Sequence, residues 1–446
     1  MKKTFTSTPY NNPNYAGAPC TVNLLTLPNS GYFSFEIVST WGASIERLYK
    51  ERTGVNIYGM GHLSEHLAFK SPRDFTTEEL MDTLRNNGRY NAATDHSYIK
   101  YFYKTVSEKA PLAIKLVCNE AFNDFSRITE EEFLTERKVV SNEAKQYADN
   151  QQVMFDFATL ATACGLDPED TVIGLASTVD TFTLPILKHL KSILLSAPYI
   201  VNIMYDPKKM TQNEVMGLLD EELCSYSLPT QCTDGFSQHD YELANELKLI
   251  KHHHLLENPS EQSLTAVVIP VDNSELNLNR EIAWAWLSQY APTSLNELIR
   301  EQNGLTYGVG LYECLMGRNH QLVFSCDVTA GTEELLMKLF KESIETTAKE
   351  FTQDKFDKLL ETVKLKGVLS RMNQEAYAYW FDIYQYHPAV FQLLEKTLKK
   401  DVEAAYDRLY NKLVTYEAVH TMLLDIADKV ALGRYSLITN YSVATA

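Results

Sequence analysis

The chain has 446 residues, more than one compact hydrophobic core usually serves, so we expect two or more domains. Its composition, 45% hydrophobic and 22% charged, is ordinary for a soluble globular protein. The formal net charge of −17 argues against nucleic acid as a partner, because binding to phosphates requires clustered Lys and Arg. The same charge is compatible with attraction of basic peptides, or with solubility alone.

Neither a membrane span nor a secretory signal is expected. No run of about 18 apolar residues occurs. Lys2 and Lys3 are not followed by the apolar segment that a signal peptide requires. The seven cysteines include no C-x-x-C pair, which favours reduced thiols in a reducing, cytoplasmic compartment.

The first half of the chain alternates between strand and helix patterns. Residues Tyr32–Thr40 have the period of a strand, and Gly59–Phe69 has that of a helix. A second helix is predicted over Thr76–Asn87, because T-x-x-E at its start is a capping box. The run Tyr98–Val106 is rich in β-formers, and a further helix begins at the capping box Thr129–Glu132.

The helix predicted over Gly59–Phe69 contains the segment His62-Leu63-Ser64-Glu65-His66. On a helix the two histidines lie one turn apart on the same face, so both imidazoles could bind one Zn²⁺. Glu65 directly precedes His66 and could reach a water on that metal. One more carboxylate would complete a catalytic zinc site, which has three protein ligands and an open position. The alternative is a surface helix that happens to carry two histidines and a glutamate.

The two halves of the chain resemble each other. At one constant offset and without gaps, Leu112 aligns with Leu335 and Phe133 with Phe356. In both halves a β-rich run leads into two helix-period segments. This agreement indicates duplication of one α+β unit, although two unrelated amphipathic helices could also align by chance.

Comparison of the two halves identifies a candidate for the third zinc ligand. Glu136 and Glu143 lie two turns apart on one face of the helix that begins at Thr129. Their counterparts in the second half are Leu359 and Lys366, and that half contains no H-x-x-E-H segment. Acids needed for the shared fold should have been kept in both halves. Because these two occur only in the half that carries the histidines, they indicate a role in the metal site, and Glu143 is the candidate third ligand.

With these features in place, the sequence resembles the pitrilysin/insulinase family of zinc metallopeptidases, the inverzincins, which includes mitochondrial processing peptidase. The resemblance rests on Gly61–Lys70, Glu143, Gly88–Thr94 and Arg300–Tyr307. It extends over nearly the whole chain. The segment Ile45–Tyr58 ahead of the motif is longer than is usual in the family.

The resemblance implies roles for the metal-site residues. His62, His66 and Glu143 would bind one zinc ion per chain. Glu65 would be the general base that activates the zinc water, and Glu136 would tune the site from just outside the ligands.

The resemblance also implies how substrate is held. Asn91, Ala92 and Ala93 would lie on an edge strand that takes the substrate peptide as an added β-strand. Arg300 and Tyr307 would face the scissile peptide, with Tyr307 stabilising the tetrahedral oxyanion.

The implied fold is α+β, with two duplicated domains that each pack helices on a mostly antiparallel sheet. We place a catalytic domain at 1–224, a linker at 225–243 and a degenerate homologous domain at 244–446. In the family, two such two-domain units face each other around an enclosed chamber. A partner is therefore expected, either a second copy or a paralogue, and Arg300 and Tyr307 would act in cis or on the partner's site.

We therefore predict a zinc endopeptidase that cuts short or unfolded peptides inside a chamber. The net charge of −17 predicts a preference for basic substrates. The alternative is a non-catalytic scaffold or partner subunit of a larger complex. Scaffold relatives typically lose ligands, whereas this chain retains all three and the base. The sequence does not separate general peptide clearance from processing of one dedicated precursor.

Overall fold

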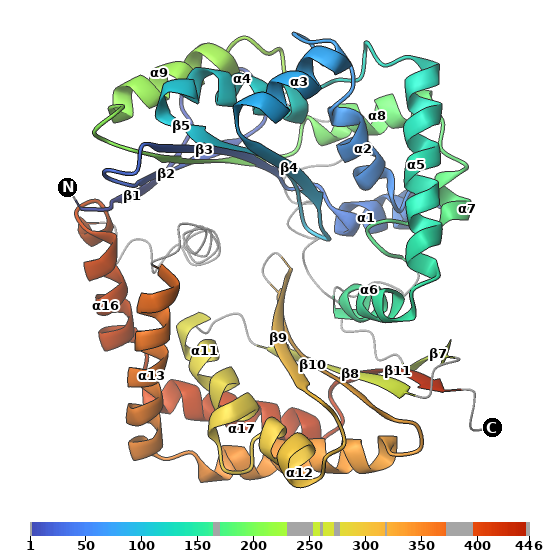
Figure 1. Cartoon of the computed structure of the whole chain (residues 1–446), viewed down its shortest axis with the longest axis vertical. Coiled ribbons are helices and arrows are strands. Elements are labelled where there is room, and N and C mark those ends of the chain that lie inside the picture. The colour runs from blue at the N-terminus through green and yellow to red at the C-terminus, as the bar shows by residue number, and fades with distance from the viewer. Residues whose placement is uncertain are drawn as a thin grey trace. The chain divides into compact units, whose positions relative to one another are not determined.

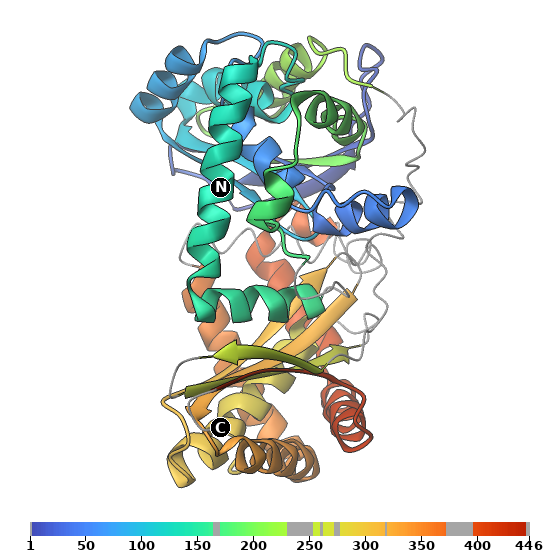
Figure 2. The same cartoon turned by 90° about the vertical axis from the view of Figure 1, so that its right-hand side faces the viewer.

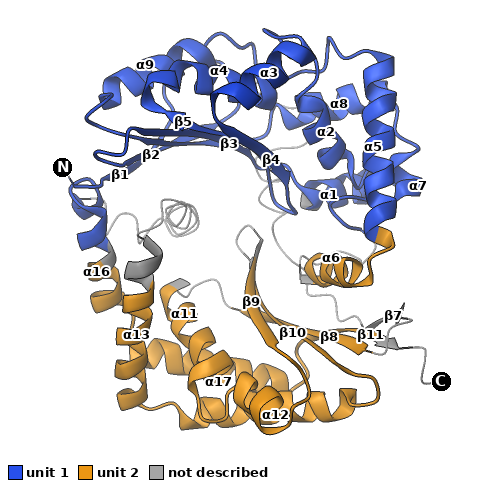
Figure 3. Cartoon of the chain, viewed as in Figure 1, with its two compact units in different colours: residues 1–147, 169–245, 392–405 blue, residues 148–168, 246–391, 406–446 orange. Residues whose placement is uncertain are grey.

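The computed structural model describes residues 2–163, 170–229, 253–258, 262–271, 277–316, 319–371 and 396–442. The chain divides into two compact units, shown in Figure 3. The first comprises residues 1–147, 169–245 and 392–405, and the second comprises 148–168, 246–391 and 406–446. This division differs from the predicted one, because 148–168 joins the second unit and 392–405 the first. Most of the predicted linker, 230–243, lies outside the described residues.

The first unit is built on a six-stranded sheet with the order β1-β2-β6-β3-β5-β4. The pairing of β2 with β6 is parallel and the other pairings are antiparallel. The strands are β1 (Phe5–Pro9), β2 (Cys20–Thr26), β3 (Tyr32–Ser39), β4 (Arg89–Thr94), β5 (Ile99–Val106) and β6 (Tyr199–Tyr205).

The helices of this unit gather on one face of the sheet and around the end of β4, as Figure 1 shows for α3, α4 and α9. They are α1 (Ala43–Thr53), α2 (Met60–Ala68), α3 (Thr77–Asn87), α4 (Ala110–Ala121), α5 (Glu130–Ala148), α7 (Ala176–Val179), α8 (Leu184–Leu194) and α9 (Gln212–Leu223). The predicted capping boxes at Thr76 and Thr129 are present, and each threonine accepts a hydrogen bond from the backbone N–H three residues on.

The second unit contains a five-stranded sheet with the order β7-β11-β8-β10-β9. In Figure 2, α12 and α17 lie on one side of this sheet and α6 on the other. Its described elements are α6 (Gln151–Ala163), β7 (His253–Asn258), β8 (Gln262–Val271), α11 (Asn277–Ala285), two π-helical turns (Trp286–Tyr290 and Asn296–Gln302), β9 (Val309–Met316), β10 (Asn319–Thr329), α12 (Glu333–Glu350), α13 (Gln353–Arg371), α17 (Tyr416–Ala431) and β11 (Ser436–Ser442). Helix α16 (Val402–Leu413) spans residues of both units.

The topology agrees with the predicted duplication. In the first sheet the order β2-β6-β3-β5-β4 begins with a parallel pair and continues antiparallel, and the second sheet repeats this pattern strand for strand. In both units the strand before the helix pair (β5, β10) is followed by two long helices (α4 and α5, α12 and α13). The α+β expectation is thus confirmed, and among the described strands β1 has no counterpart in the second sheet.

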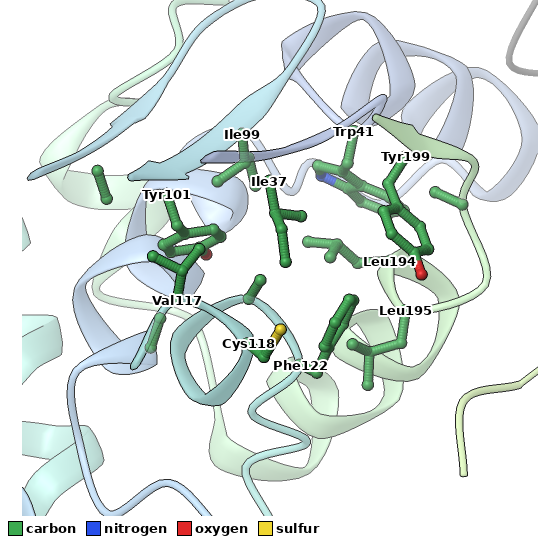
Figure 4. Close-up of a cluster of buried hydrophobic side chains, with 14 of the residues drawn as sticks. Ile37, Trp41, Ile99, Tyr101, Val117, Cys118, Phe122, Leu194, Leu195 and Tyr199 are labelled. Atoms are coloured by element: carbon green, nitrogen blue, oxygen red, sulfur yellow. The ribbon is translucent and has the colours of Figure 1, made fainter. Parts of the chain in front are cut away.

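The core of the first unit lies between the sheet and its helices. In Figure 4, Ile37 and Tyr101 of the sheet point toward Val117 and Cys118 of α4. These side chains are buried, with exposed fractions of 1% or less. Because side chains alternate along a strand, the intervening residues of β5 project from the opposite face of the sheet.

Two further sequence expectations bear on the fold. The cysteines Cys20, Cys118, Cys224, Cys314 and Cys326 are free thiols, as predicted. In the part of the chain that the structure describes, no helix is both long and apolar enough to cross a membrane.

Candidate active site

Helix α2 carries the H-x-x-E-H segment, and its N-terminus is held by close backbone contacts. Gly59 caps the helix with a φ of 94°, a left-handed conformation that favours glycine. A Cβ on Gly59 would lie 2.5 Å from the carbonyl oxygen of Ile173. Glu46 of α1 is 1% exposed and accepts hydrogen bonds from the N–H groups of Gly59 (3.2 Å) and Gly61 (2.6 Å). The start of the helix is therefore fixed by groups from two other segments.

The two histidines of α2 meet Glu143 of α5. The Oε2 atom of Glu143 lies 3.9 Å from Nε2 of His62 and 3.6 Å from Nε2 of His66. One ligand atom from each of the three residues lies within 4.8 Å of the others. Ligand atoms about 2 Å from one tetrahedral zinc ion would lie roughly 3.3 Å apart. The three side chains would therefore need to approach one another only slightly to bind a zinc ion. Two imidazoles and a carboxylate are also a donor set typical of catalytic zinc.

The protonation of His62 suits a metal ligand. Burial, together with the neighbouring His66, lowers the pKa of His62 to about 3. The imidazole is therefore neutral at pH 7 and has a lone pair available. Metal binding requires this neutral form.

The ring of His66 is oriented by a contact between its Nδ1 nitrogen and Glu136. Its Nδ1 atom lies 3.5 Å from Oε2 of Glu136, which leaves Nε2 directed at Glu143. Burial opposes a charged His66, but the hydrogen bond to Glu136 and the carboxylates of Glu143 and Glu65 outweigh it and raise its pKa. Glu136 also forms a 2.8 Å ion pair with Lys70. Burial alone would raise the pKa of Glu136, yet its contacts with His66 and Lys70 lower it, so this acid is charged. A charged carboxylate on the outer nitrogen fixes the ring orientation that a metal requires.

Glu65 is held by the end of strand β4. The hydroxyl of Thr94 donates a 2.6 Å hydrogen bond to Oε2 of Glu65. Burial raises the pKa of Glu65, the hydrogen bond from Thr94 opposes the rise, and the charge of Glu143 adds to it. The result is a half-buried carboxylate with more than ordinary affinity for a proton, beside the cluster of His62, His66 and Glu143.

The predicted substrate strand is at the edge of its sheet. Asn91, Ala92 and Ala93 lie on β4, the last strand in the sheet order, paired only with β5 in the described sheet. Ala92 is buried, whereas Asn91 is exposed. The same strand ends at Thr94, so the edge leads to Glu65.

Arg300 and Tyr307 belong to the second unit, where the structure brings them together. The guanidinium carbon of Arg300 lies 5.3 Å from the centre of the Tyr307 ring, a cation–π distance. Between them, Gly304 adopts the left-handed conformation with a φ of 60°. Tyr307 is 89% exposed, which leaves its hydroxyl accessible to another group.

Sequence reasoning missed three residues around the site. Thr94 and Lys70 stand in segments that carry the family resemblance, but their spacing gives no sign that they contact Glu65 and Glu136. Glu46 lies on a separate helix, and nothing in the linear pattern distinguishes it from the other acids of the chain. Each contact depends on which elements pack together.

Comparison with known families places both halves of the chain. The pattern described as Insulinase (Peptidase family M16) matches residues 53–170. The pattern described as Peptidase M16 inactive domain matches residues 237–363. Together the two matches cover more than half of the chain, and the first contains the H-x-x-E-H segment and Glu143.

Individual relatives carry related names. The zinc protease PqqE of Helicobacter pylori is 30% identical over 138 residues, which are 30% of this chain and 31% of that protein. This match thus spans less than a third of the relative. An uncharacterized zinc protease of Rickettsia bellii is 22% identical over 327 residues, 72% of this chain and 75% of the relative.

The fold has solved counterparts. A protease from Helicobacter pylori superposes with a TM-score of 0.71 at 16% identity, covering 98% of this chain and all of that one. This similarity concerns the two-domain fold. With the family patterns matching both halves, the chain belongs to the pitrilysin/insulinase family of peptidases, peptidase family M16.

Proposed function

We propose that this chain is a zinc endopeptidase that hydrolyses extended peptides bound along β4. The observation that carries the proposal is the convergence of His62, His66 and Glu143, whose ligand atoms lie within 4.8 Å of one another, beside the half-buried Glu65. Relatives named zinc proteases support the assignment.

The donor set fits zinc, because two neutral-capable imidazoles and one carboxylate meet at nearly tetrahedral spacing and Glu136 orients one ring. Held by His62, His66 and Glu143, zinc would supply Lewis acidity and an activated water at neutral pH.

Glu65 would be the general base. Its carboxylate would take a proton from the attacking water and pass it to the departing amine nitrogen. The raised pKa favours acceptance of the first proton, while the hydroxyl of Thr94 keeps the carboxylate aimed and ionised before the reaction.

The substrate would add to the edge of β4 as a further strand. Its backbone would pair with the main chain of Asn91, Ala92 and Ala93, and pairing of this kind is largely independent of side chains. Arg300 and Tyr307 would bind the developing oxyanion, in this chain's site or in that of a partner. Loss of one such donor costs about 10²–10³ in rate in a serine protease. The partner would be a second copy or a paralogue.

A non-catalytic scaffold is the competing role. The intact ligand set, the charged Glu136 and the hydrogen-bonded Glu65 all favour catalysis, because a scaffold has no need of any of them.

The test is cleavage of a mixed peptide library followed by mass spectrometry, with zinc content measured in parallel. We expect about one zinc per chain, cleavage that a chelator abolishes, and a loss of about 10²–10⁴-fold in Glu65→Gln with zinc retained. Cleavage by Glu65→Gln at the native rate would refute the assigned base. If the zinc-loaded chain cuts no peptide, either alone or mixed with paralogues, the scaffold role is favoured over catalysis.

A further inference from the structure

Helices α2 and α5, which carry the candidate zinc ligands, meet along a row of acids. Glu132, Glu136 and Glu143 follow one another on α5 at spacings of four and seven residues. Because an α-helix turns by about 100° per residue, the three side chains lie within about 40° of one another on one face. This face contacts α2, which lies beside α5 in Figure 1.

The contacts of the three acids follow α2 in antiparallel order. Glu143 contacts both histidines of the motif, and Glu136 contacts His66 at the end of it. Glu132 contacts Ser71, just beyond the C-terminus of α2, where the serine hydroxyl donates a 2.8 Å hydrogen bond to Oε1 of Glu132. A helix rises about 1.5 Å per residue, so Glu132 lies roughly 16 Å along α5 from Glu143. The contact with Ser71 is thus the far end of the interface between the two ligand-bearing helices.

Ser71 adopts a backbone conformation that serine rarely takes. Its φ is 40°, in the left-handed region that favours glycine. Its N–H donates a 3.0 Å hydrogen bond to the hydroxyl of Thr77. The carbonyl groups of the residues on either side accept hydrogen bonds from Asn123 (2.8 Å) and Arg127 (2.5 Å). A strained residue persists only where its surroundings fix it, so this turn is a rigid point of attachment for α5.

Glu132 uses the two oxygens of its carboxylate for two different tasks. Oε2 accepts the N–H and the hydroxyl of Thr129, at 3.0 and 3.1 Å, which completes the capping box at the start of α5. Oε1 accepts the hydroxyl groups of Ser71 at 2.8 Å and Thr77 at 3.3 Å. Burial would raise the pKa of Glu132, but the hydrogen bonds to both oxygens lower it, so the carboxylate is charged and its hydrogen bonds are strong. We call Ser71, Thr77 and Glu132 the clamp.

The capping box of α9 shows what Glu132 adds. Glu214 accepts the N–H and the hydroxyl of Thr211 with one oxygen, at 2.7 and 2.8 Å. Within the part of the chain that the structure describes, Glu214 makes no hydrogen bond to another helix or turn. A capping box therefore needs only one carboxylate oxygen, and the second oxygen of Glu132 ties α5 to the turn that follows α2.

We propose that the clamp sets the position of α5 along α2, so that Ser71 and Glu132 are positioning residues for the metal site. The inference rests on the proposed function, because it concerns the zinc ligands assigned there. Distances between a metal and its ligands vary by only about 0.2 Å in good sites. Even a small shift of α5 along α2 would therefore weaken coordination by Glu143. The clamp prevents this shift without touching the metal or a ligand.

The test measures metal binding by the full chain. The Kd for Zn²⁺ is obtained by competition with a chelator, and Co²⁺ is bound in a parallel sample because its visible absorption depends on coordination geometry. Loss of a residue that contacts a metal ligand weakens binding about 10- to 100-fold. We expect Glu132→Ala to raise the Kd for Zn²⁺ about 10-fold, at the lower end of that range, because Glu132 acts through its helix. The Co²⁺ absorption of the same variant should change.

Three further variants separate positioning from stability. Glu214→Ala is the matched control, since it removes a capping box from α9 but no clamp, and it should leave the Kd unchanged. Ser71→Gly removes the hydroxyl of the clamp together with the strain of the positive φ, so the metal-free variant should unfold at nearly the native Tm while its Kd rises. Ser71→Asn tolerates the left-handed conformation and has an amide that can donate to Glu132, so it should restore much of the affinity.

Two results would overturn the proposal. One is a Kd for Zn²⁺ that is the same in the native chain, Glu132→Ala and Ser71→Gly. The other is a loss of affinity in Glu214→Ala as large as in Glu132→Ala, which would assign the effect to helix capping alone. Metal binding is measured without hydrolysis, so the clamp can be supported in a chain that cuts no peptide. Conversely, a chain that cleaves peptides but keeps its metal affinity in the clamp variants would be a peptidase without this positioning device.

Discussion

Glu46 offers a stringent test of how the motif helix is held. The side chain is 1% exposed, and its carboxyl group accepts the N–H groups of Gly59 and Gly61 at the start of α2. Burial raises the pKa of Glu46 to about 8, although these two hydrogen bonds act against the rise. The folded chain therefore keeps a proton on Glu46 in a pH range where the unfolded chain has lost it.

The sign of the pH dependence follows from this difference. The stabilising contribution of a raised carboxyl pKa is fully present below the unfolded value of 4.5 and is lost as pH rises through about 8. Each unit of pKa shift corresponds to about 1.4 kcal/mol. Between pH 5.5 and 8 the native chain should therefore lose about 3 kcal/mol of unfolding free energy relative to Glu46→Gln, which has no proton to release.

The assay is urea unfolding of metal-free native and Glu46→Gln protein at several pH values, which keeps zinc linkage out of the comparison. Glu46→Ala adds a second comparison, because it leaves two buried N–H groups without acceptors at about 1–3 kcal/mol each, whereas Gln retains a carbonyl acceptor. Parallel stability curves for the native and Gln proteins from pH 5.5 to 8 would refute the assigned burial of a neutral carboxyl group. Equal stability of the Ala and Gln variants would refute the capping role.

Three further perturbations test other contacts. Thr94→Val removes the hydrogen bond to the Glu65 carboxylate, which is worth about 1.5–3 kcal/mol because the acceptor is charged. The apparent pKa of the acidic limb of the kcat/KM–pH profile should therefore rise by about one to two units, with zinc content unchanged. An unchanged apparent pKa would contradict the role of Thr94. Gly59→Ala should lower the unfolding free energy by about 2 kcal/mol or more, because Gly59 has a positive φ and an added Cβ would collide with the Ile173 carbonyl. The control is Gly217→Ala on α9, where the added Cβ would meet open space, and it should be neutral or stabilising. Thermal unfolding of both variants measures the difference. Lys191 is fully buried and donates to the carbonyl oxygen of Ala121, and burial lowers its pKa to about 7. The unfolding free energy of the native chain should therefore rise by about 2 kcal/mol relative to that of Lys191→Met between pH 7 and pH 9. If the native and Met proteins differ in urea midpoint by the same amount at both pH values, the lowered pKa is refuted.

Much of the local structure could be predicted from the sequence. The pairing of His62 with His66 on one helix face, the capping boxes at Thr76 and Thr129, and the duplicated order of strand and helices are all present in the structure. These features depend on periods and caps that act within one element, so the linear pattern contains them. Glu143 was found through comparison of the two halves, because the second copy lacks an acid at that place.

What the sequence left undecided depends on contacts between elements. Which side chain aims Glu65, which cation holds Glu136 and which acid caps α2 were decided by the packing of α1, α2, β4 and α5, since the residues are far apart in the chain. The exchange of segments 148–168 and 392–405 between the units is likewise invisible in a linear boundary.

Charge shows the same division. Composition determined a net charge of −17, and from it a preference for basic substrates was predicted. The register of β4 with β5 instead gathers Arg89, Lys100 and Lys104 on one face. The field of an exposed charge extends over about a Debye length, roughly 8–10 Å, so the charges that surround a strand depend on the local register and not on the total charge of the chain.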